Sequence, residues 1–123
     1  MYEVTIKREF SAAHMLQEIG GRCEDLHGHN FTVEATVTAA ALTNEGIMVD
    51  FRNVKRWLDE VLGVLDHRCL NELPFFSGIN PSSENIARFI FDRIREKLPP
   101  GPSLAKVTVW ESEDARVSYT GEV

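Results

Sequence analysis

Residues 27–38 read HGHNFTVEATVT, and polar and apolar side chains alternate along them. A period of two is typical of a β-strand with one buried face, because successive side chains point to opposite faces of the sheet. The apolar positions are Phe31, Val33, Ala35 and Val37. Followed backwards, the same parity reaches His29 and His27. We therefore expect both histidines on the apolar side of their strand.

A similar alternation begins the chain. Tyr2, Val4 and Ile6 are apolar, and the residues between them are polar. Continued along the strand, this parity leads through residues 10 and 12 to His14. If the strand pairs with residues 27–38, three imidazoles meet on one side of the pair.

Two helices are predicted further along the chain. Residues 49–63, VDFRNVKRWLDEVLG, have apolar side chains at helical spacing, and Asp50 is suited to cap the helix. A second helix is expected after NPSS at residues 80–83, with Ser82 or Ser83 as its cap. The sequence PPGP then ends it.

Two short strands, at residues 105–111 and 115–119, complete the pattern. The order β-β-α-α-β-β predicts an α+β fold, with an antiparallel four-stranded sheet and both helices on one face. The bare second face indicates that the chain assembles with copies of itself.

Glu111 shares the parity of Val107 and Val109. A carboxylate on that apolar side needs a partner, because burial of an unpaired charge is unfavourable.

Composition limits the class of protein. A chain of 123 residues suits one domain, expected to span residues 1–123. Its net charge of −6 argues against nucleic acid as a partner. No apolar run approaches the ~20 residues that cross a bilayer, and MYEVTIKREF lacks the apolar segment of a signal peptide. We expect a cytoplasmic protein with no membrane partner, whose two cysteines stay reduced.

The three histidines suggest a metal site. His27 and His29 lie two residues apart on one face of a strand, and His14 can supply a third ligand. Three histidines with an open fourth position form a catalytic zinc arrangement.

Cys23 has two interpretations. As a ligand it would close a structural zinc site, whereas as a base or nucleophile it would leave the metal open to substrate. The spacing does not separate them.

A second pair of titratable residues lies in LDHR, residues 65–68, where Asp66 precedes His67. A carboxylate that holds an imidazole in one tautomer is a common acid–base device. The competing interpretation is a surface pair at the end of a helix.

Six short motifs occur together along nearly the whole chain. They are FSAAH, CEDLHGH, MVDF, LDH, PSSEN and VWE, at residues 10–14, 23–29, 48–51, 65–67, 81–85 and 109–111. Their order and spacing resemble the superfamily of 6-pyruvoyltetrahydropterin synthase and 6-carboxytetrahydropterin synthase. The resemblance implies the tunnelling fold (T-fold), in which three subunits close their sheets into a barrel and two trimers stack into a homo-hexamer.

The resemblance also implies roles for individual residues. The metal ligands would be His14, His27 and His29, and they would bind Zn²⁺. The catalytic residues would be Cys23, Asp66, His67 and Glu111, with Cys23 as the general base rather than a ligand. Glu111 would also anchor the pterin ring, because a carboxylate can accept two parallel hydrogen bonds. Ser82 and Ser83 would contact the pterin at positions where the family usually has threonine.

Three residues separate Cys23 from His27, which resembles the bacterial 6-carboxytetrahydropterin synthase branch of the queuosine and deazapurine pathways. The implied activity is that of a zinc-dependent lyase. It would convert 7,8-dihydroneopterin triphosphate to 6-carboxy-5,6,7,8-tetrahydropterin, with release of acetaldehyde and triphosphate. The triphosphate contacts are not indicated, and the candidates are Lys7, Arg8, Arg22 and Arg116.

Other functions stay open on the sequence. One is 6-pyruvoyltetrahydropterin synthase, and another is a folate-type dihydroneopterin triphosphate side-chain lyase, which Glu24 beside Cys23 keeps open. A function of a different class is a non-catalytic, zinc-stabilised module that binds a pterin or a purine. A structural oligomer with histidines in its core ranks last, because it leaves Cys23, Asp66 and Glu111 with no shared purpose.

Overall fold

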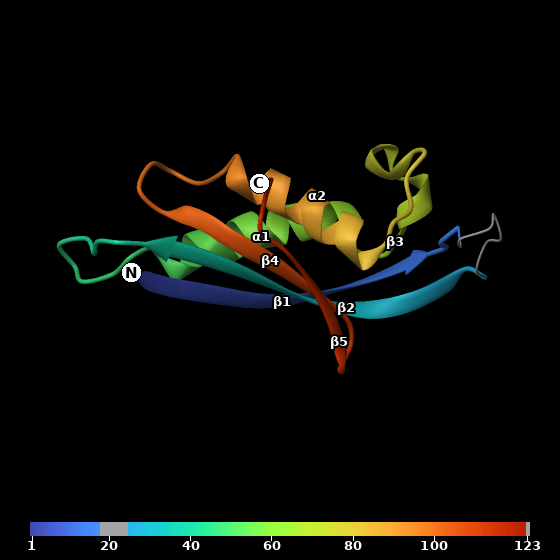
Figure 1. Cartoon of the computed structure of the whole chain (residues 1–123), viewed down its shortest axis with the longest axis horizontal. Helices are drawn as coiled ribbons and strands as arrows, with labels where there is room; N and C mark the ends of the chain where they lie inside the picture. Colours follow the sequence, from blue (N-terminus) through green and yellow to red (C-terminus); the bar gives the residue numbers. More distant parts are fainter. Residues whose placement is uncertain (18–24, 123) are drawn as a thin grey trace.

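The computed structural model describes residues 1–17 and 25–122. They form an α+β fold in which one sheet carries two helices on a single face (Figure 1). The strands are β1 (Tyr2–His14), β2 (His27–Ala39), β3 (Arg68–Cys69), β4 (Ser103–Ser112) and β5 (Ala115–Tyr119). The helices are α1 (Phe51–Leu65) and α2 (Ser83–Arg95), with short 3₁₀ turns η1 (Leu70–Glu72) and η2 (Pro74–Phe76) between them.

The long strands β1 and β2 form the centre of the fold. They pair in antiparallel fashion from Tyr2 opposite Ala39 to His14 opposite His27. The predicted parity of both strands is confirmed, since side chains that face the helices, such as Phe10 and Phe31, are buried. This register brings all three predicted histidines to the same end of the sheet.

The sheet has five strands in the order β3-β1-β2-β4-β5, one more than the predicted four. The additional strand β3 contains two residues and pairs in parallel with Ala12 and Ala13 of β1, so the sheet is mixed. A two-residue strand has no periodicity to detect. It forms because the chain leaving α1 docks on β1, where the backbone N–H of His67 donates to Ser11 O at 2.6 Å.

Both predicted helix caps are present. The Asp50 side chain accepts from Arg52 N at 2.9 Å at the start of α1. At the start of α2, Ser82 Oγ accepts from Asn85 N at 3.2 Å, so Ser82 rather than Ser83 is the cap. Helix α2 ends at Arg95, and Leu98 packs against the core beyond it. No helix in the described ranges combines the length and apolar character needed to cross a membrane.

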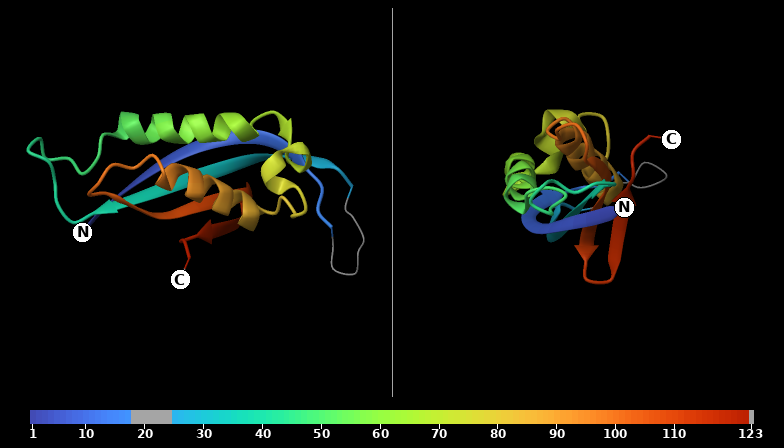
Figure 2. Two further views of the ribbon diagram at one scale, coloured as in Figure 1. Left: turned by 90° about the horizontal axis from the view of Figure 1, so that it is seen from above. Right: turned by 90° about the vertical axis from the view of Figure 1, so that its left-hand side faces the viewer.

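The two faces of the sheet differ in chemistry. Both helices lie against one face of the sheet (Figure 2). The core lies between the sheet and the helices, where side chains such as Val33, Leu58 and Ile86 are fully buried. On the opposite face the hydroxyls of Thr5 and Thr36 hydrogen bond at 3.0 Å. The bare face inferred from the sequence is therefore a polar surface.

Candidate active site

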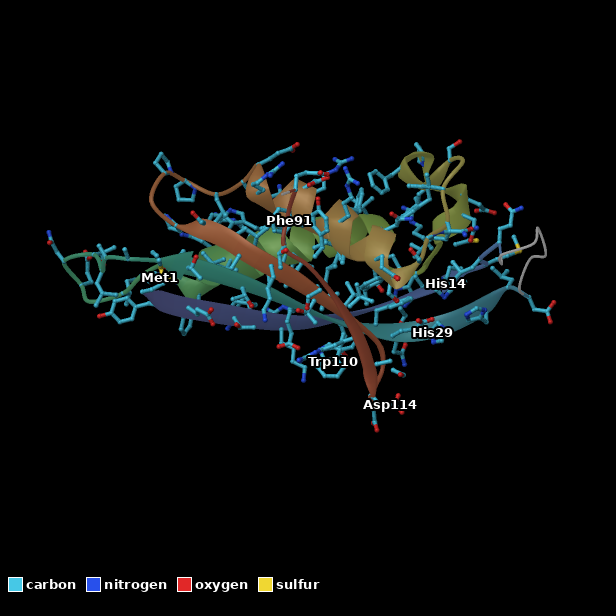
Figure 3. The ribbon with its side chains drawn as sticks, viewed as in Figure 1. Met1, His14, His29, Phe91, Trp110 and Asp114 are labelled. Carbon is cyan, nitrogen blue, oxygen red and sulfur yellow. The ribbon has the colours of Figure 1, made fainter. Side chains whose placement is uncertain are left out.

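Three imidazoles gather where β1 ends and β2 begins. The ring centroid of His14 lies 4.7 Å from that of His27 and 5.3 Å from that of His29, and the rings of His27 and His29 are 4.8 Å apart. Figure 3 shows His14 and His29 on the two neighbouring strands at this end of the sheet. The side chain of His14 is completely buried. The structure thus brings together the three histidines that were predicted as metal ligands.

Backbone carbonyls orient two of these rings. His14 Nδ1 lies 2.8 Å from Pro81 O, and His27 Nδ1 lies 2.9 Å from Asp25 O. A carbonyl oxygen only accepts, so Nδ1 carries the proton in each ring. Nε2 is then left with a lone pair, as in a metal-ligating histidine whose other nitrogen donates to a carbonyl. The tautomers are therefore arranged for metal binding.

Glu111, from β4, completes the cluster. Its Oε1 lies 3.1 Å from His29 Nε2 and 3.5 Å from His14 Nε2, and its Oε2 accepts from Ser83 Oγ at 3.3 Å. The sequence indicated that this carboxylate needs a partner. Ser83 Oγ donates to one of its oxygens, and the other faces the Nε2 atoms of His14 and His29, where a cation between them would satisfy all three.

The cluster fits a zinc ion. One donor atom from each of His14, His27, His29 and Glu111 lies within 4.8 Å of the other three. Tetrahedral zinc with bonds of ~2.0–2.1 Å separates its donors by roughly 3.4 Å, close to the contacts of Glu111 Oε1. His14 Nε2 is buried and makes no hydrogen bond within the described part of the chain. A buried nitrogen acceptor without a donor is the arrangement that a cation satisfies.

Asp66 and His67 follow the last residue of α1 and form a second group on the edge of β1. Asp66 Oδ1 accepts from Ser11 N at 2.9 Å, and Oδ2 lies 2.9 Å from His67 Nδ1. The Ser11 N–H donated to the carboxylate lowers the pKa of Asp66, and the His67 imidazole lowers it further. His67 has a φ of +58°, in the left-handed region that non-glycine residues rarely adopt. This backbone leaves the imidazole 83% exposed with its Nδ1 held by Asp66.

An open pocket of about 500 Å³ is lined by one residue of each group, His67 and His29. Arg68 and Cys69 of β3 line it as well. Arg68 was not among the cations considered for the triphosphate. Its position directly after the LDH motif could have indicated that it lies near the candidate site.

The other predicted site residues do not all lie near the histidine cluster. Cys23, Glu24 and Arg22 lie outside the described residues. Ser83 is buried against Glu111, whereas Ser82 Oγ caps α2. Among the candidate cations, Arg8 pairs with Asp59 at 2.8 Å, and Arg116 stacks over the ring of Trp110 at 4.9 Å. Lys7 lines a separate cavity with Glu34 and Trp110 on the polar face of the sheet.

The fold and the cluster together define a tunnelling-fold protein with a candidate metal centre of three histidines and one carboxylate. Comparison with known proteins then identifies the family. The family model described as 6-pyruvoyl tetrahydropterin synthase matches residues 3–122. The chain belongs to this family.

Individual relatives agree with this assignment. A dihydroneopterin monophosphate aldolase of Pyrococcus furiosus is 35% identical over 111 residues, which cover 90% of each chain. An Archaeoglobus fulgidus protein, provisionally named 6-carboxy-5,6,7,8-tetrahydropterin synthase, is 38% identical over 90% of this chain and 89% of its own. The solved 6-pyruvoyl tetrahydropterin synthase of Caenorhabditis elegans superimposes with a TM-score of 0.82 at 28% identity and covers 99% of this chain and 98% of that one. Family membership places the chain among pterin side-chain lyases.

Proposed function

We propose that the chain is a zinc-dependent 6-carboxy-5,6,7,8-tetrahydropterin synthase. It takes 7,8-dihydroneopterin triphosphate and water to 6-carboxytetrahydropterin, acetaldehyde and triphosphate. The observation that carries the proposal is the cluster of His14, His27 and His29, with Nδ1 of two rings held by backbone carbonyls and Glu111 beside them. The Archaeoglobus fulgidus relative, with this name and 38% identity, supports the choice of branch.

The three histidines would hold the zinc ion and leave its fourth position open to substrate, with Glu111 beside the ion rather than bound to it. When bound, it would supply Lewis-acid polarisation of the substrate's side-chain hydroxyls, which makes neighbouring protons easier to remove. Glu111, held by Ser83, would accept the paired N–H groups of the pterin ring. Ser82 and Ser83 would flank the ring from the start of α2.

Two groups would move protons in this proposal. Cys23 would act as the thiolate base on one side of the substrate. His67 would serve the other side, with Asp66 accepting from its Nδ1–H and stabilising the imidazolium that forms. Because His67 and His29 line one cavity, a substrate bound at the histidine cluster would extend toward His67.

The proposal includes assembly into a homo-hexamer in the cytoplasm. Among the strand pairings described, β1 has no partner on its outer edge before Ala12, and β5 has none on its outer side. Unpaired edges are templates for pairing with another chain. Three copies that join β1 to β5 would close a barrel and turn the polar face of each sheet inward.

One incubation tests the proposed activity. Zinc-loaded protein is mixed with 7,8-dihydroneopterin triphosphate, products are identified by mass, and acetaldehyde is assayed. Carboxytetrahydropterin with equimolar acetaldehyde is expected. Pyruvoyltetrahydropterin without acetaldehyde would assign the chain to the other branch, and unchanged substrate with zinc still bound would favour a non-catalytic pterin-binding module.

The 35% identity to the Pyrococcus furiosus aldolase favours one competing activity. The incubation should therefore be repeated with dihydroneopterin monophosphate at the same concentration. Faster turnover of the monophosphate would contradict the proposed substrate but not the proposed metal site. His67→Asn, which leaves the histidine cluster intact, is the matched variant and should retain zinc while losing turnover.

A further inference from the structure

From Ser11 in β1 to Gln17, three residues beyond the end of the strand, the outer edge of the chain is hydrogen bonded by backbone and side-chain groups of several kinds. In a strand, every second residue presents both its N–H and its C=O to the same edge. Ser11 meets the Asp66 side chain and the His67 backbone, and β3 pairs beside it at Ala12 and Ala13. Beyond β3, none of the described strands pairs with this edge.

Two asparagine side chains take the place of a strand there. Asn71 accepts from Met15 N at 2.9 Å and donates to Met15 O at 2.8 Å. Asn80 accepts from Gln17 N at 2.8 Å and donates to Gln17 O at 2.9 Å. A side-chain amide has an acceptor oxygen and an N–H on the same side of its C–N bond, so it can present both to one edge, as the N–H and C=O of a single strand residue do. Each asparagine therefore pairs as one residue of a strand would, in continuation of β3.

The two asparagines are linked to His14 of the histidine cluster, one through the strand that carries it and the other through the carbonyl that orients its ring. Met15 follows His14 directly, and Asn80 precedes Pro81, whose carbonyl accepts from His14 Nδ1. Asn85, in the first turn of α2, donates from Nδ2 to Asn80 O at 2.8 Å and so fixes Asn80 to the helix. The strand that carries His14 and the carbonyl that sets its tautomer are thus held together through Asn80.

We propose that Asn71 and Asn80 are positioning residues, which complete the edge of β1 around His14 and thereby set the affinity of the histidine cluster for its metal ion. Groups that orient a ligand typically change metal affinity ~10–100-fold when they are removed. The inference rests on the proposed metal site but is independent of the pterin reaction.

The test compares Asn→Asp substitutions, which keep the shape of the side chain. In Asn80→Asp the carboxylate still accepts from Gln17 N, but its second oxygen faces Gln17 O and can no longer donate. Asn71→Asp makes the same change at Met15, and Asn80→Ser removes the pair without adding a charge, in case the Asp variants fail to fold. The matched control is Asn44→Asp, because Asn44 is exposed in the turn at residues 43–46, away from the cluster.

Two measurements separate positioning from mere stability. The first is the zinc dissociation constant, obtained by competition with a chromophoric chelator. The second is amide hydrogen exchange of Met15 and Gln17 in the metal-free protein. Val61→Ala is included as a variant that shortens a buried side chain of α1 and lowers the melting temperature without touching the cluster.

We expect Asn80→Asp and Asn71→Asp to raise the zinc dissociation constant about tenfold. Asn80→Ser, which takes the acceptor away from Gln17 N, should also speed hydrogen exchange of the Gln17 amide. Asn44→Asp and Val61→Ala should leave the constant unchanged. Equal zinc constants for Asn80→Asp and the wild type, or a rise that Val61→Ala reproduces, would overturn the inference. A wild-type chain that binds no zinc would overturn both proposals, whereas zinc binding without pterin turnover would overturn only the proposed function.

Discussion

At the scale of single residues, Asp66 makes the connection between the acid–base pair and the sheet. Its carboxylate accepts from Ser11 N and faces His67 Nδ1, so one side chain joins the end of α1 to β1. Its pKa is lowered below the ordinary value of 3.8, chiefly by the Ser11 N–H. A carboxyl group whose folded pKa is lowered stabilises the fold above its unfolded pKa, and that stabilisation is lost as the pH falls through the folded pKa.

Asp66→Asn should therefore destabilise the protein at pH 7, and the difference from the wild type should shrink as the pH falls below about 4. Urea unfolding of both proteins at a series of pH values measures this. A difference that is independent of pH would show that the charge of Asp66 does not contribute to stability.

A second prediction at this scale concerns the metal ligands. His27→Ala removes one donor, and we expect the loss of stoichiometric zinc, an effect larger than the ~10–100-fold change caused by residues behind the ligands. Elemental analysis of dialysed protein measures the zinc content. His67→Ala is the control, since its exposed imidazole lies on the far side of the shared cavity, and loss of zinc from this variant would contradict the ligand set.

The residue pattern predicted much of the cluster. Parity along three separate stretches placed His14, His29 and Glu111 on the apolar side of the sheet, and the structure has them there. The contact of Pro81 with His14 was not predicted, because it joins residues far apart in the sequence through a backbone atom that every residue type possesses. The hydrogen bond from Ser11 N to Asp66 was not predicted for the same reason.

At the scale of elements, the predicted helices and the four longer strands are confirmed, and β3 was missed. Strong periodicity and side-chain caps made the long elements predictable. Strand β3 has neither, since the docking of Asp66 and His67 on β1 determines it. Four successive residues before and at the start of α2 each make a different contact. Asn80 pairs with Gln17 and Pro81 O accepts from His14. Ser82 caps the helix and Ser83 donates to Glu111.

Ser82→Ala tests this helix start. Removal of the cap should lower the free energy of unfolding by about 1 kcal/mol, because Asn85 N loses its acceptor. Chemical denaturation measures the change. Ser112→Ala, which removes a hydroxyl that bonds Asp114 in an exposed turn, is the control and should change stability much less. Equal effects of the two changes would mean that the cap adds nothing.

At the scale of the whole molecule, the proposed assembly depends on the outer edges of β1 and β5, with which no other described strand pairs before Ala12 of β1 or along β5. Lys7 lies four residues before Ser11 on the same parity, so its N–H faces the outer edge rather than β2. Proline at such a position removes an outward donor while leaving the inner ladder in place.

Lys7→Pro should therefore reduce the proposed hexamer to smaller species, while Lys7→Ala should leave it intact. Light scattering coupled to size-exclusion chromatography measures the mass in solution, and circular dichroism checks that each variant keeps its fold. A Lys7→Pro protein that folds and stays hexameric would show that the outer edge of β1 is not the assembly contact.

The spread of the histidine–glutamate cluster along the chain has a consequence for metal supply. The proposed ligands lie on β1 and β2 and Glu111 lies on β4, so the cluster is complete only after these three strands have come together. Loading of the proposed metal site would therefore follow folding, and nitrogen and oxygen donors of this kind bind several divalent metals in the general order of intrinsic affinity. The ion found in protein purified from a host cell will then report which metal that cell held available, and chelation followed by reloading is needed before any activity is attributed to zinc.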